Sequence, residues 1–391
     1  MAVAVTTRLA EPASSVAENL RPTRALIDLN AVRHNIGVVR RGIGMKPRIM
    51  AVVKANAYGH GMVPVARAAV QAGATALGVA TADEGLALRE SEGFADADIL
   101  VMSPTLAHEA DAMQGADVGC AVGSLELLKH HLDVAHRAGR RARVHVQVET
   151  GIGRDGIRFD EPEWINLAAA NADHIAGIFT HFAVADGIEA DQIAFTNLQC
   201  DRFEAVVAQA RSAGVHATIH AANSGAILRH PRAHYDMVRP GIMIYGIEPS
   251  DMPELCPELR PVLSLRSAIA SLRMAEPGDT ISYGRTWTAQ QPTLIGIVPA
   301  GYGDGYLRQF SNRAEVLVRG RRVPVRGRVC MDQFMIDLST VPEAGIGDEV
   351  VLYGAQGAGS IRAEEAARLA GTIGYEITCL VTQRVPRSYV E

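Results

Sequence analysis

Short apolar runs alternate with amphipathic stretches from residue 45 to residue 245. The runs predict strands at residues 49–54, 76–80, 99–102, 118–122, 144–149, 176–181, 218–222 and 237–245. Between them lie helical segments such as 124–138, with Ser124 as its cap and Gly139 at its end, and 191–213. An open doubly wound sheet usually has fewer such units. The pattern therefore predicts an α/β fold class with an N-terminal (β/α)8 TIM barrel.

After about residue 255 the pattern changes to short alternating runs separated by Gly and Pro turns. These runs, at residues 262–269, 293–298, 314–318 and 347–353, predict a C-terminal mostly-β domain with one helix at 363–370. A chain of 391 residues exceeds one typical domain. We therefore divide it into a flexible N-terminal extension (1–22), the barrel (23–255) and the β domain (256–391).

Composition narrows the class of protein. A net charge of -5 gives no electrostatic reason to expect binding to nucleic acid or to an anionic membrane. The five cysteines are odd in number, far apart and without a CxxC spacing, which favours a reducing compartment. Residues 1–20 lack the pattern of a secretory signal, and no apolar run approaches the roughly 20 residues of a membrane helix. We expect a soluble, cytoplasmic protein.

Three histidines raise the question of a metal site. His130, His131 and His136 lie on one expected surface helix without an accompanying carboxylate pattern. We interpret them as solvated side chains and expect no metal.

Lys54 is one of only three lysines in a chain whose Lys and Arg total is 38. Arginine stays protonated in proteins, whereas lysine can lose its proton and form a Schiff base with an aldehyde. Tyr58 can donate a hydrogen bond to a phosphate, and Gly59 and Gly61 allow the backbone to approach a ligand closely. Lys54 therefore suggests pyridoxal phosphate as a cofactor, although a lone lysine at a strand end is usually a solvated charge.

Further polar residues follow the expected strands, where TIM barrels carry their chemistry. Arg154 follows the fifth strand, His181 ends the sixth, and Asn223 and Ser224 follow the seventh. The segment at 223–225 offers a hydroxyl and free amides to a phosphate, and a simple capping turn explains it equally well. Arg239 lies in an apolar run, where it needs a partner. Directed at a pyridine nitrogen, it would disfavour protonation there and favour return of a proton to the substrate α-carbon.

Several motifs occur in a fixed order: residues 51–61, 150–154, 180–182, 222–224, 239–241, 281–284, 301–306, 329–332 and 371–376. With these motifs the chain resembles the alanine racemase family of fold-type III pyridoxal enzymes over nearly its whole length after residue 24. The resemblance implies pyridoxal 5'-phosphate as the cofactor and a homodimer with shared active sites.

The resemblance also implies a role for each matching residue. Lys54 would hold the cofactor and act as base on one face of the substrate, and Tyr283 from the other subunit would act on the opposite face. Arg154 would contact the cofactor's phenolic oxygen, and Arg239 the ring nitrogen with His181 behind it. The remaining cofactor contacts would come from Tyr58, Asn223, Ser224, Gly241, Ile242 and Tyr375. Substrate contacts would come from Arg154, Met331, Tyr302 and Asp332.

One residue departs from the family pattern. Where the family commonly has a lysine that carries a carbamate, this chain has Gln147. Glutamine cannot form the carbamate, so the negative charge that would orient Arg154 is missing, and an amide oxygen is a weaker acceptor. We expect a chloride or a water near Gln147 and Arg154.

The two-base arrangement is also chemically reasonable, because inverting a stereocentre is most direct when one group removes a proton and another returns it from the opposite face. We therefore expect a racemase that interconverts L-alanine and D-alanine and supplies D-alanine for peptidoglycan. A racemase acting on serine or on a broader set of amino acids is the alternative. A decarboxylase is less expected, since Arg239 stands where that class has an acidic residue. A non-catalytic pyridoxal-binding protein is also less expected, since it would resemble a lone barrel.

Overall fold

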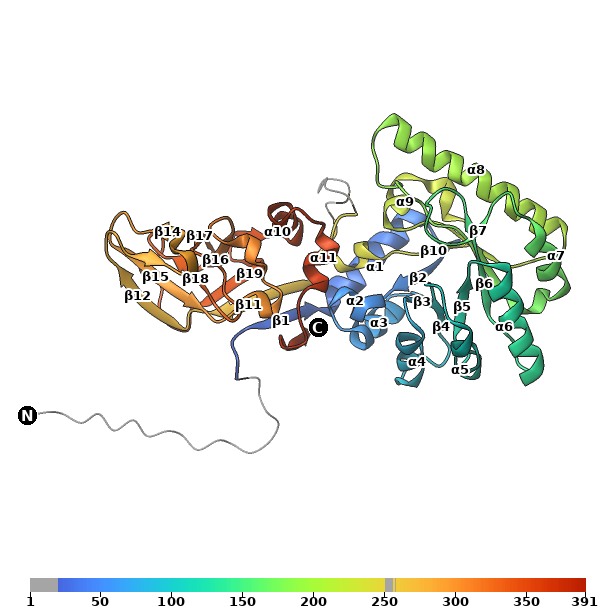
Figure 1. Ribbon diagram of the computed structural model, residues 1–391, viewed down its shortest axis with the longest axis horizontal. Helices are drawn as coiled ribbons and strands as arrows, with labels where there is room; N and C mark the ends of the chain where they lie inside the picture. Colours follow the sequence, from blue (N-terminus) through green and yellow to red (C-terminus); the bar gives the residue numbers. More distant parts are fainter. Residues whose placement is uncertain (1–19, 250–255, 257) are drawn as a thin grey trace, which may run out of the picture.

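The chain folds into two lobes, a barrel and an elongated β domain (Figure 1). The computed structural model describes residues 20–249, 256 and 258–391. The expected flexible extension at 1–22 lies outside the described residues except for its last three positions.

Eight parallel strands form the barrel. They are β2 (Arg48–Val52), β3 (Ala76–Val79), β4 (Asp98–Val101), β5 (Gly119–Val122), β6 (Val144–Glu149), β8 (Ile175–Phe179), β9 (Thr218–His220) and β10 (Met237–Val238). Each strand pairs with the next one in this order, and β10 pairs with β2 and closes the barrel. The short strand β7 (Ile157–Arg158) adds to the end of β6. The predicted TIM barrel is confirmed.

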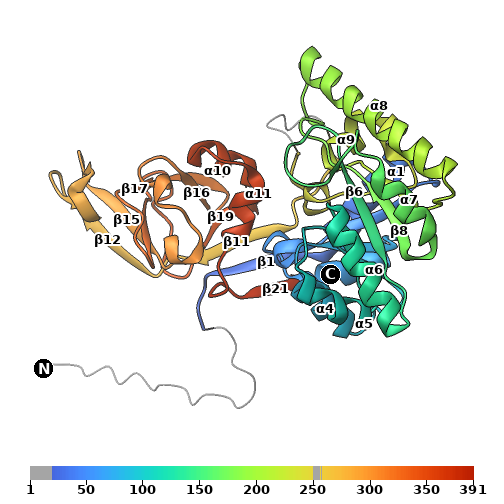
Figure 2. The ribbon, with the colours of Figure 1, turned by 45° about the vertical axis from the view of Figure 1, so that its right-hand side comes forward.

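Helices cover the outside of the barrel (Figures 1 and 2). They are α1 (Leu29–Ile43), α3 (Met62–Gln71), α4 (Ala82–Glu90), α5 (Ala110–Gly115), α6 (Leu125–Ala138), α7 (Glu163–Ala170), α8 (Ala190–Ser212) and α9 (Ser224–Arg229). As expected, the Ser124 side chain caps α6, accepting from the Leu127 N–H at 3.1 Å, and Gly139 ends it with φ of 61°.

The interpretation of His131 as a solvated side chain is wrong, because His131 is fully buried. It lies three residues after Leu128 and four before Ala135, on the stripe of α6 that faces the sheet. Its ring contacts the Thr105 hydroxyl and the Cys120 thiol, each at 3.3 Å.

Several strand predictions extend too far. The strand expected at 237–245 ends at Val238, because Pro240 has no N–H for the ladder and the chain continues as the 3-10 helix η4 (Ile242–Tyr245). Strand β2 ends at Val52, before Lys54, and β8 ends before His181. Both side chains therefore lie on turns beyond the strands.

The described part of the β domain contains a ten-stranded sheet. Its order is β12 (Ser271–Ala275), β15 (Thr293–Val298), β18 (Phe334–Asp337), β17 (Arg321–Arg326), β16 (Glu315–Val318), β19 (Glu349–Gln356), β11 (Leu263–Ala268), β1 (Arg24–Asp28) and β21 (Arg387–Val390), with β20 (Gly359–Ile361) paired to β19. A short ribbon joins β13 (Thr280–Ile281) to β14 (Trp287–Thr288). The predicted mostly-β architecture of this half is confirmed.

Both ends of the described chain enter this sheet. Strand β1 pairs antiparallel with β11 and parallel with β21, so residues 24–28 belong to the β-domain sheet although they precede the barrel. Figure 2 shows β1 and β21 running side by side between the lobes. The chain therefore links the two lobes more than once.

The helix expected at 363–370 is α10 (Ala363–Ala370), and a further helix, α11 (Gly374–Cys379), follows it. The expectation of one helix was wrong because α11 is a short segment without helical periodicity. It reaches the barrel and contacts α2 (Lys54–Tyr58). The remaining described 3-10 helices are η1 (Ala107–Glu109), η2 (Ala172–His174), η3 (Pro231–His234), η5 (Tyr283–Arg285), η6 (Tyr302–Asp304) and η7 (Arg308–Phe310).

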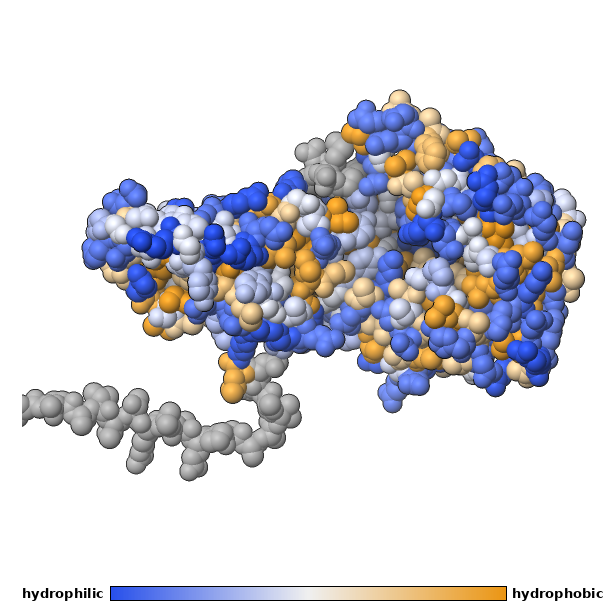
Figure 3. All heavy atoms as spheres, viewed as in Figure 1, coloured by the Kyte–Doolittle hydropathy of each residue, from blue (hydrophilic) through white to orange (hydrophobic). Residues whose placement is uncertain are grey.

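No helix within the described ranges is both long enough and apolar enough to cross a membrane. On the face that Figure 3 shows, hydrophobic residues lie interspersed with hydrophilic ones on both lobes.

Candidate functional site

A cavity of about 440 Å³ opens at the carboxyl ends of the barrel strands. The structure brings together there the residues expected to contact a cofactor, which are Lys54, Tyr58, Arg154, His181, Asn223, Ser224, Arg239, Gly241, Ile242 and Tyr375. Gln147 also lines the cavity. The residues that converge on it are far apart along the chain, as is usual for sites at the carboxyl end of a barrel.

An unusual turn holds Lys54 at the edge of this cavity. Residues 55–58 all have positive φ angles, between 52° and 53°, so α2 is a left-handed turn built without glycine. This conformation costs on the order of 1 kcal/mol or more for each such residue. Glu84 offsets part of the cost, since its carboxylate accepts from the Ala55 N–H at 2.7 Å and the Ala80 N–H at 2.8 Å. Strain of this kind is common at functional sites.

The surroundings of Lys54 favour its neutral amine. Burial lowers the pKa of Lys54 below its ordinary value of 10.5, and the positive charge of Arg154 lowers it further. Glu84 acts in the opposite direction. A larger fraction of neutral amine makes Lys54 a better nucleophile toward an aldehyde and a better base.

Donors for an anionic group also line the cavity. The Ser224 hydroxyl accepts from the Gly241 N–H at 3.0 Å, while Asn223 caps α9 through the Ala226 N–H at 3.0 Å. A Cβ at Gly241 would lie 2.8 Å from the Tyr58 hydroxyl, so the backbone needs a glycine here to approach the tyrosine.

Tyrosines from both lobes lie close together. The ring of Tyr58 lies 4.8 Å from that of Tyr245 and 6.0 Å from that of Tyr375, measured between centroids. Tyr375 comes from α11, on the β-domain side of the sequence. Burial raises the pKa of Tyr58 and of Tyr375 well above 10, so both hydroxyls stay protonated and can donate.

Arg239 is a buried cation beneath the cavity. Its guanidinium donates to the carbonyls of Thr180 and Ala221 at 2.9 Å, to His220 Nδ1 at 3.1 Å and to His181 Nδ1 at 3.3 Å. Burial lowers its pKa to about 9, so Arg239 remains charged at neutral pH. Its Nε has no partner among the described residues, which leaves one donor free for a ligand.

Gln147 lies in the cavity wall near Arg154 and is almost completely buried. Its amide donates to the Asp155 carbonyl at 2.8 Å. The loop that carries Arg154 is held by the Glu149 carboxylate, which accepts from the backbone N–H groups of Gly153 and Arg154 at 2.9 and 3.2 Å.

The structure does not bring the other expected site residues to this cavity. Tyr283, Tyr302, Met331 and Asp332 lie on loops of the β domain. Three of them are conspicuously exposed for their size: Tyr283 is 72% exposed, Met331 52% and Tyr302 42%. Exposed large apolar side chains on neighbouring loops are typical of a surface that meets a partner.

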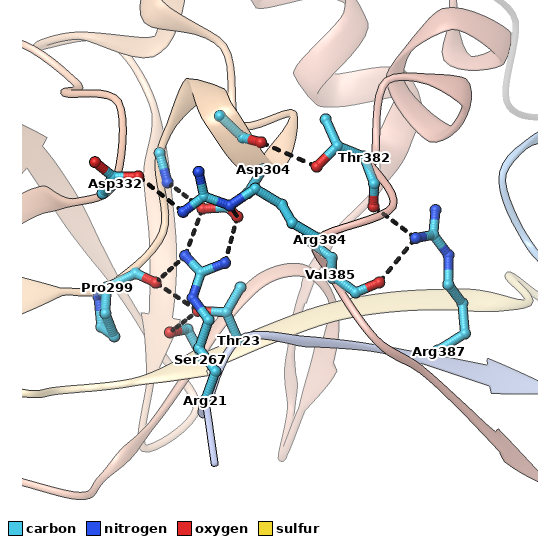
Figure 4. Close-up of polar contacts among 12 residues, drawn as sticks. Arg21, Thr23, Ser267, Pro299, Asp304, Asp332, Thr382, Arg384, Val385 and Arg387 are labelled. Atoms are coloured by element: carbon cyan, nitrogen blue, oxygen red, sulfur yellow. Dashed lines mark hydrogen bonds and ion pairs between the residues drawn. The ribbon is translucent and has the colours of Figure 1, made fainter. Parts of the chain in front are cut away.

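A buried carboxylate holds these loops (Figure 4). Asp304 is fully buried. Its carboxylate accepts from Arg21 and from the Gly301 N–H at 2.9 Å, and it forms an ion pair with Arg384, whose Nε lies 3.0 Å away. Arg384 also pairs with Asp332 at 2.7 Å. The residues just before β1 and just before β21 thus fix the loops that carry Tyr302 and Asp332.

Sequence reasoning missed several residues near the cavity. Phe179 and Asp186 line it, and the hydroxyl of Tyr245 donates to the Val52 carbonyl at 2.8 Å. His220, in β9, contacts Arg239 directly. The one available signal for His220 was a polar residue inside an apolar strand, which also marks many structural positions.

Two family models match this chain. The model described as "Alanine racemase, N-terminal domain" matches residues 27–249, and the one described as "Alanine racemase, C-terminal domain" matches residues 262–389. The curated alanine racemase of Symbiobacterium thermophilum is 45% identical over 375 residues, covering 95% of this chain and 98% of that protein. That of Geobacter sulfurreducens is 44% identical, covering 95% and 97%.

Solved structures agree with these matches. The alanine racemase from D-cycloserine-producing Streptomyces lavendulae superposes with a TM-score of 0.89 at 37% identity, covering 96% of this chain and 98% of that one. The enzyme from Bacillus anthracis with bound L-Ala-P superposes with a TM-score of 0.87 at 36% identity, covering 96% of each chain. From its end-to-end likeness to these proteins and the match to both family models, the chain belongs to the alanine racemase family.

Proposed function

We propose that this protein interconverts L-alanine and D-alanine with pyridoxal 5'-phosphate as its cofactor. The observation that carries the proposal is the cavity around Lys54, set in a chain that matches alanine racemases from end to end. The product D-alanine would serve the synthesis of peptidoglycan. All five cysteines, which fall within the described residues, are free thiols, and this supports the expected cytoplasmic location.

The residues of the cavity fit the cofactor. Its volume of about 440 Å³ lies within the range of pockets that hold small molecules. Lys54 offers an amine whose pKa is lowered by burial, and protonated tyrosine hydroxyls with Ser224 offer donors for a phosphate. Arg239 has one buried donor, Nε, without a partner among the described residues. Each polar group of the cofactor would therefore meet a complementary side chain.

When bound, pyridoxal phosphate supplies an aldehyde for the amino group and a ring that withdraws electrons from the α-carbon. The Lys54 amine is the base at the α-carbon on one face. Arg239 stays positively charged and donates hydrogen bonds, so it disfavours a proton on the pyridine nitrogen. Arg154 would contact the phenolic oxygen, and His181, whose pKa burial holds well below 6.5, lies beside them as a neutral ring.

The second acid or base would come from another subunit. Among the described residues, the tyrosines that line the cavity are Tyr58 and Tyr375, which we assign to the phosphate, whereas Tyr283 is exposed on the β domain. We propose a head-to-tail homodimer in which Tyr283, Tyr302, Met331 and Asp332 complete the partner's cavity. Tyr283 acts at the face opposite Lys54, and Met331 and Asp332 lie near the substrate carboxylate.

A small anion near Gln147 would replace the missing carbamate. Gln147 has a neutral amide where the family commonly has the carbamate, and the NH2 group of this amide already donates to the Asp155 carbonyl. A chloride could orient Arg154 by charge, as a carbamate would. An anomalous-scattering map of bromide-soaked crystals tests this, and a map without a peak near Gln147 and Arg154 excludes the anion.

Three experiments test the function. Borohydride reduction of the loaded protein should fix the cofactor on Lys54, which peptide mass spectrometry detects, and reduction that labels other residues but not Lys54 contradicts the proposal. Racemisation should fall sharply in both directions in Tyr283→Phe, with Tyr389→Phe as a control tyrosine on β21; unchanged rates would remove the two-base role. Chiral chromatography with several L-amino acids identifies the substrate, and faster turnover of serine than of alanine would favour the alternative racemase.

A further inference from the structure

Two histidines continue the hydrogen bonds of Arg239 through the interior of the barrel. His220 Nδ1 lies 3.1 Å from Arg239 Nη1, and His220 Nε2 lies 2.9 Å from His145 Nδ1. All three side chains are buried. His220 stacks on Phe179 with ring centroids 5.0 Å apart and an angle of 8°, and the guanidinium of Arg239 lies 5.4 Å from the centroid of the same ring.

The hydrogen-bonding capacity of each group determines where the protons lie. A guanidinium can only donate, so His220 Nδ1 must accept and the proton of this neutral ring is on Nε2. His220 Nε2 then donates to His145 Nδ1, which must also accept. The proton of His145 is therefore on its own Nε2. Burial keeps both rings neutral, with the pKa of His220 well below 6.5 and that of His145 lowered to about 3.

The far end of this chain of hydrogen bonds meets a second cavity. His145 lines a space of about 260 Å³ at the amino ends of the strands, which Arg48, Asp98 and Arg143 also line. The two arginines pair with Asp98 there. The Nε2 proton of His145 can thus meet water or a polar group, and it does not compete with the bond to His220.

The backbone makes room for the His145 ring. A Cβ at Gly177, on the neighbouring strand β8, would lie 2.1 Å from His145 Nδ1 and 2.6 Å from its Cε1. Any larger residue at 177 would push against the ring atom that accepts from His220. The position of the His145 ring therefore depends on two strands: β6, which carries His145, and β8, where Gly177 leaves space for the ring.

We propose that His145 is a positioning residue for the racemase: by accepting from His220 it fixes the tautomer of that ring, and His220 in turn holds Arg239 toward the cofactor ring. This inference rests on the proposed function. With His145 Nδ1 absent, His220 has no acceptor for its Nε2 proton and can move its proton or rotate. Arg239 then loses one of the contacts that fix its guanidinium, and its control of the pyridine nitrogen weakens.

Weaker control should appear as a side reaction. With a less restricted pyridine nitrogen, a larger share of turnovers should return the proton to the cofactor instead of to the α-carbon. Hydrolysis then leaves the amino group on the cofactor and releases pyruvate. In this step alanine is oxidised to the keto acid and the cofactor aldehyde is reduced to an amine, so no other oxidant is needed. The ratio of pyruvate formed to alanine racemised reports it.

The experiment compares four variants of the full-length holoenzyme. His145→Leu removes the acceptor, and His145→Gln keeps one in its amide oxygen. Gly177→Ala displaces the ring without changing it. His216→Leu is the control, because His216 is an exposed residue that lines the same cavity outside the chain of hydrogen bonds. Pyruvate is measured with lactate dehydrogenase, and racemisation by chiral chromatography.

We expect the pyruvate ratio to rise about tenfold in His145→Leu, the equivalent of one net hydrogen bond, and to rise in Gly177→Ala. It should return toward the unmodified value in His145→Gln and stay unchanged in His216→Leu. Equal ratios in His145→Leu and His216→Leu would overturn the proposal.

Nitrogen-15 NMR of histidine-labelled protein gives a second readout that needs no turnover. In the unmodified protein, His220 and His145 should each carry the proton on Nε2 at pH 7. A proton on Nδ1 of either ring contradicts the proposal, and this measurement decides the matter if His145→Leu does not fold. A protein that shows the expected tautomers but does not racemise alanine contradicts the proposed function instead.

Discussion

Asp304 supplies a test of how the ends of the chain stabilise the β domain. Its carboxylate is fully buried, accepts N–H groups from Arg21 and Gly301, and forms an ion pair with Arg384 (Figure 4). In Asp304→Asn, one oxygen remains to accept and the new amide group faces donors. At least one of these hydrogen bonds is therefore lost, and two cations lose their shared counter-charge.

The magnitude follows from the burial of the partners. Removing one member of a buried ion pair costs about 3–5 kcal/mol. The arginine side chains are 27% and 43% exposed, so solvent screens them and we expect a cost below this range, about 2–3 kcal/mol. With an m-value near 3 kcal/mol/M for a protein of this size, the urea midpoint should fall by about 1 M.

The assay is urea unfolding followed by tryptophan fluorescence and circular dichroism at one fixed protein concentration. Asp332→Asn is the matched control, because the Asp332 carboxylate is 62% exposed and, among the described residues, forms an ion pair only with Arg384, at 2.7 Å. An exposed pair contributes about 0–1 kcal/mol, so this midpoint should hardly move. Equal midpoints for Asp304→Asn and Asp332→Asn would refute the reasoning.

Three further predictions concern the barrel. In the cofactor-free protein, Lys54 should react with pyridoxal at a lower pH than Lys129, since its pKa is lowered; peptide mapping across pH 7–11 would show equal profiles if burial has no effect. Gly59→Ala should destabilise the protein by about 1–3 kcal/mol, because φ is 85° and the new Cβ would lie 2.2 Å from the Thr378 carbonyl oxygen; calorimetry measures the loss. Gly73→Ala is the control, because Gly73 has φ of 100° and no atom near its new Cβ, so this variant shows the cost of backbone strain without a steric clash. Burial lowers the pKa of His145 to about 3, so between pH 6.5 and pH 3 the unfolded state binds one more proton than the folded state, and stability is lost as the pH falls through this window. In His145→Gln, the slope of the unfolding free energy against pH should be smaller by roughly 1.4 kcal/mol per pH unit in this window, the effect of one proton. Identical pH–stability curves for the two proteins would contradict the prediction.

The sequence predicted the barrel well because each strand is marked by an apolar run within its own short segment. Buried parallel strands are nearly continuous apolar runs, and their order along the chain is their order around the barrel. Strand ends were less accurate. The turn after Val52 has left-handed backbone dihedrals although it contains no glycine, so its residue types did not predict it. The strand that ends before Pro240 was predicted to reach residue 245 because the apolar pattern continues that far. Periodicity reports which face is buried but not where hydrogen bonding to a neighbour stops.

Chemistry at the strand ends was visible in the same way. Three charged residues stood out because each lies in or next to an apolar run, where a charge is unfavourable unless it has a partner or a function: Lys54, Arg154 and Arg239. The structure places all three around one cavity. Tyr375 entered only through the family resemblance, since a short helix without periodicity carries it. Its position beside Tyr58 depends on α11 packing against the barrel, a contact between segments more than 300 residues apart.

By itself, the sequence determined the eight apolar strands, the mostly-β second half and the unusual lysine just beyond the first barrel strand. Only the tertiary structure decided that β1 and β21 pair with each other, that Asp304 joins Arg21 to Arg384, and that His145 meets His220 inside the barrel. The physical reason is the same in each case. Hydrophobic burial leaves a periodic trace in one segment, whereas a hydrogen bond or an ion pair depends on the orientation of two groups that the chain brings together only after it has folded.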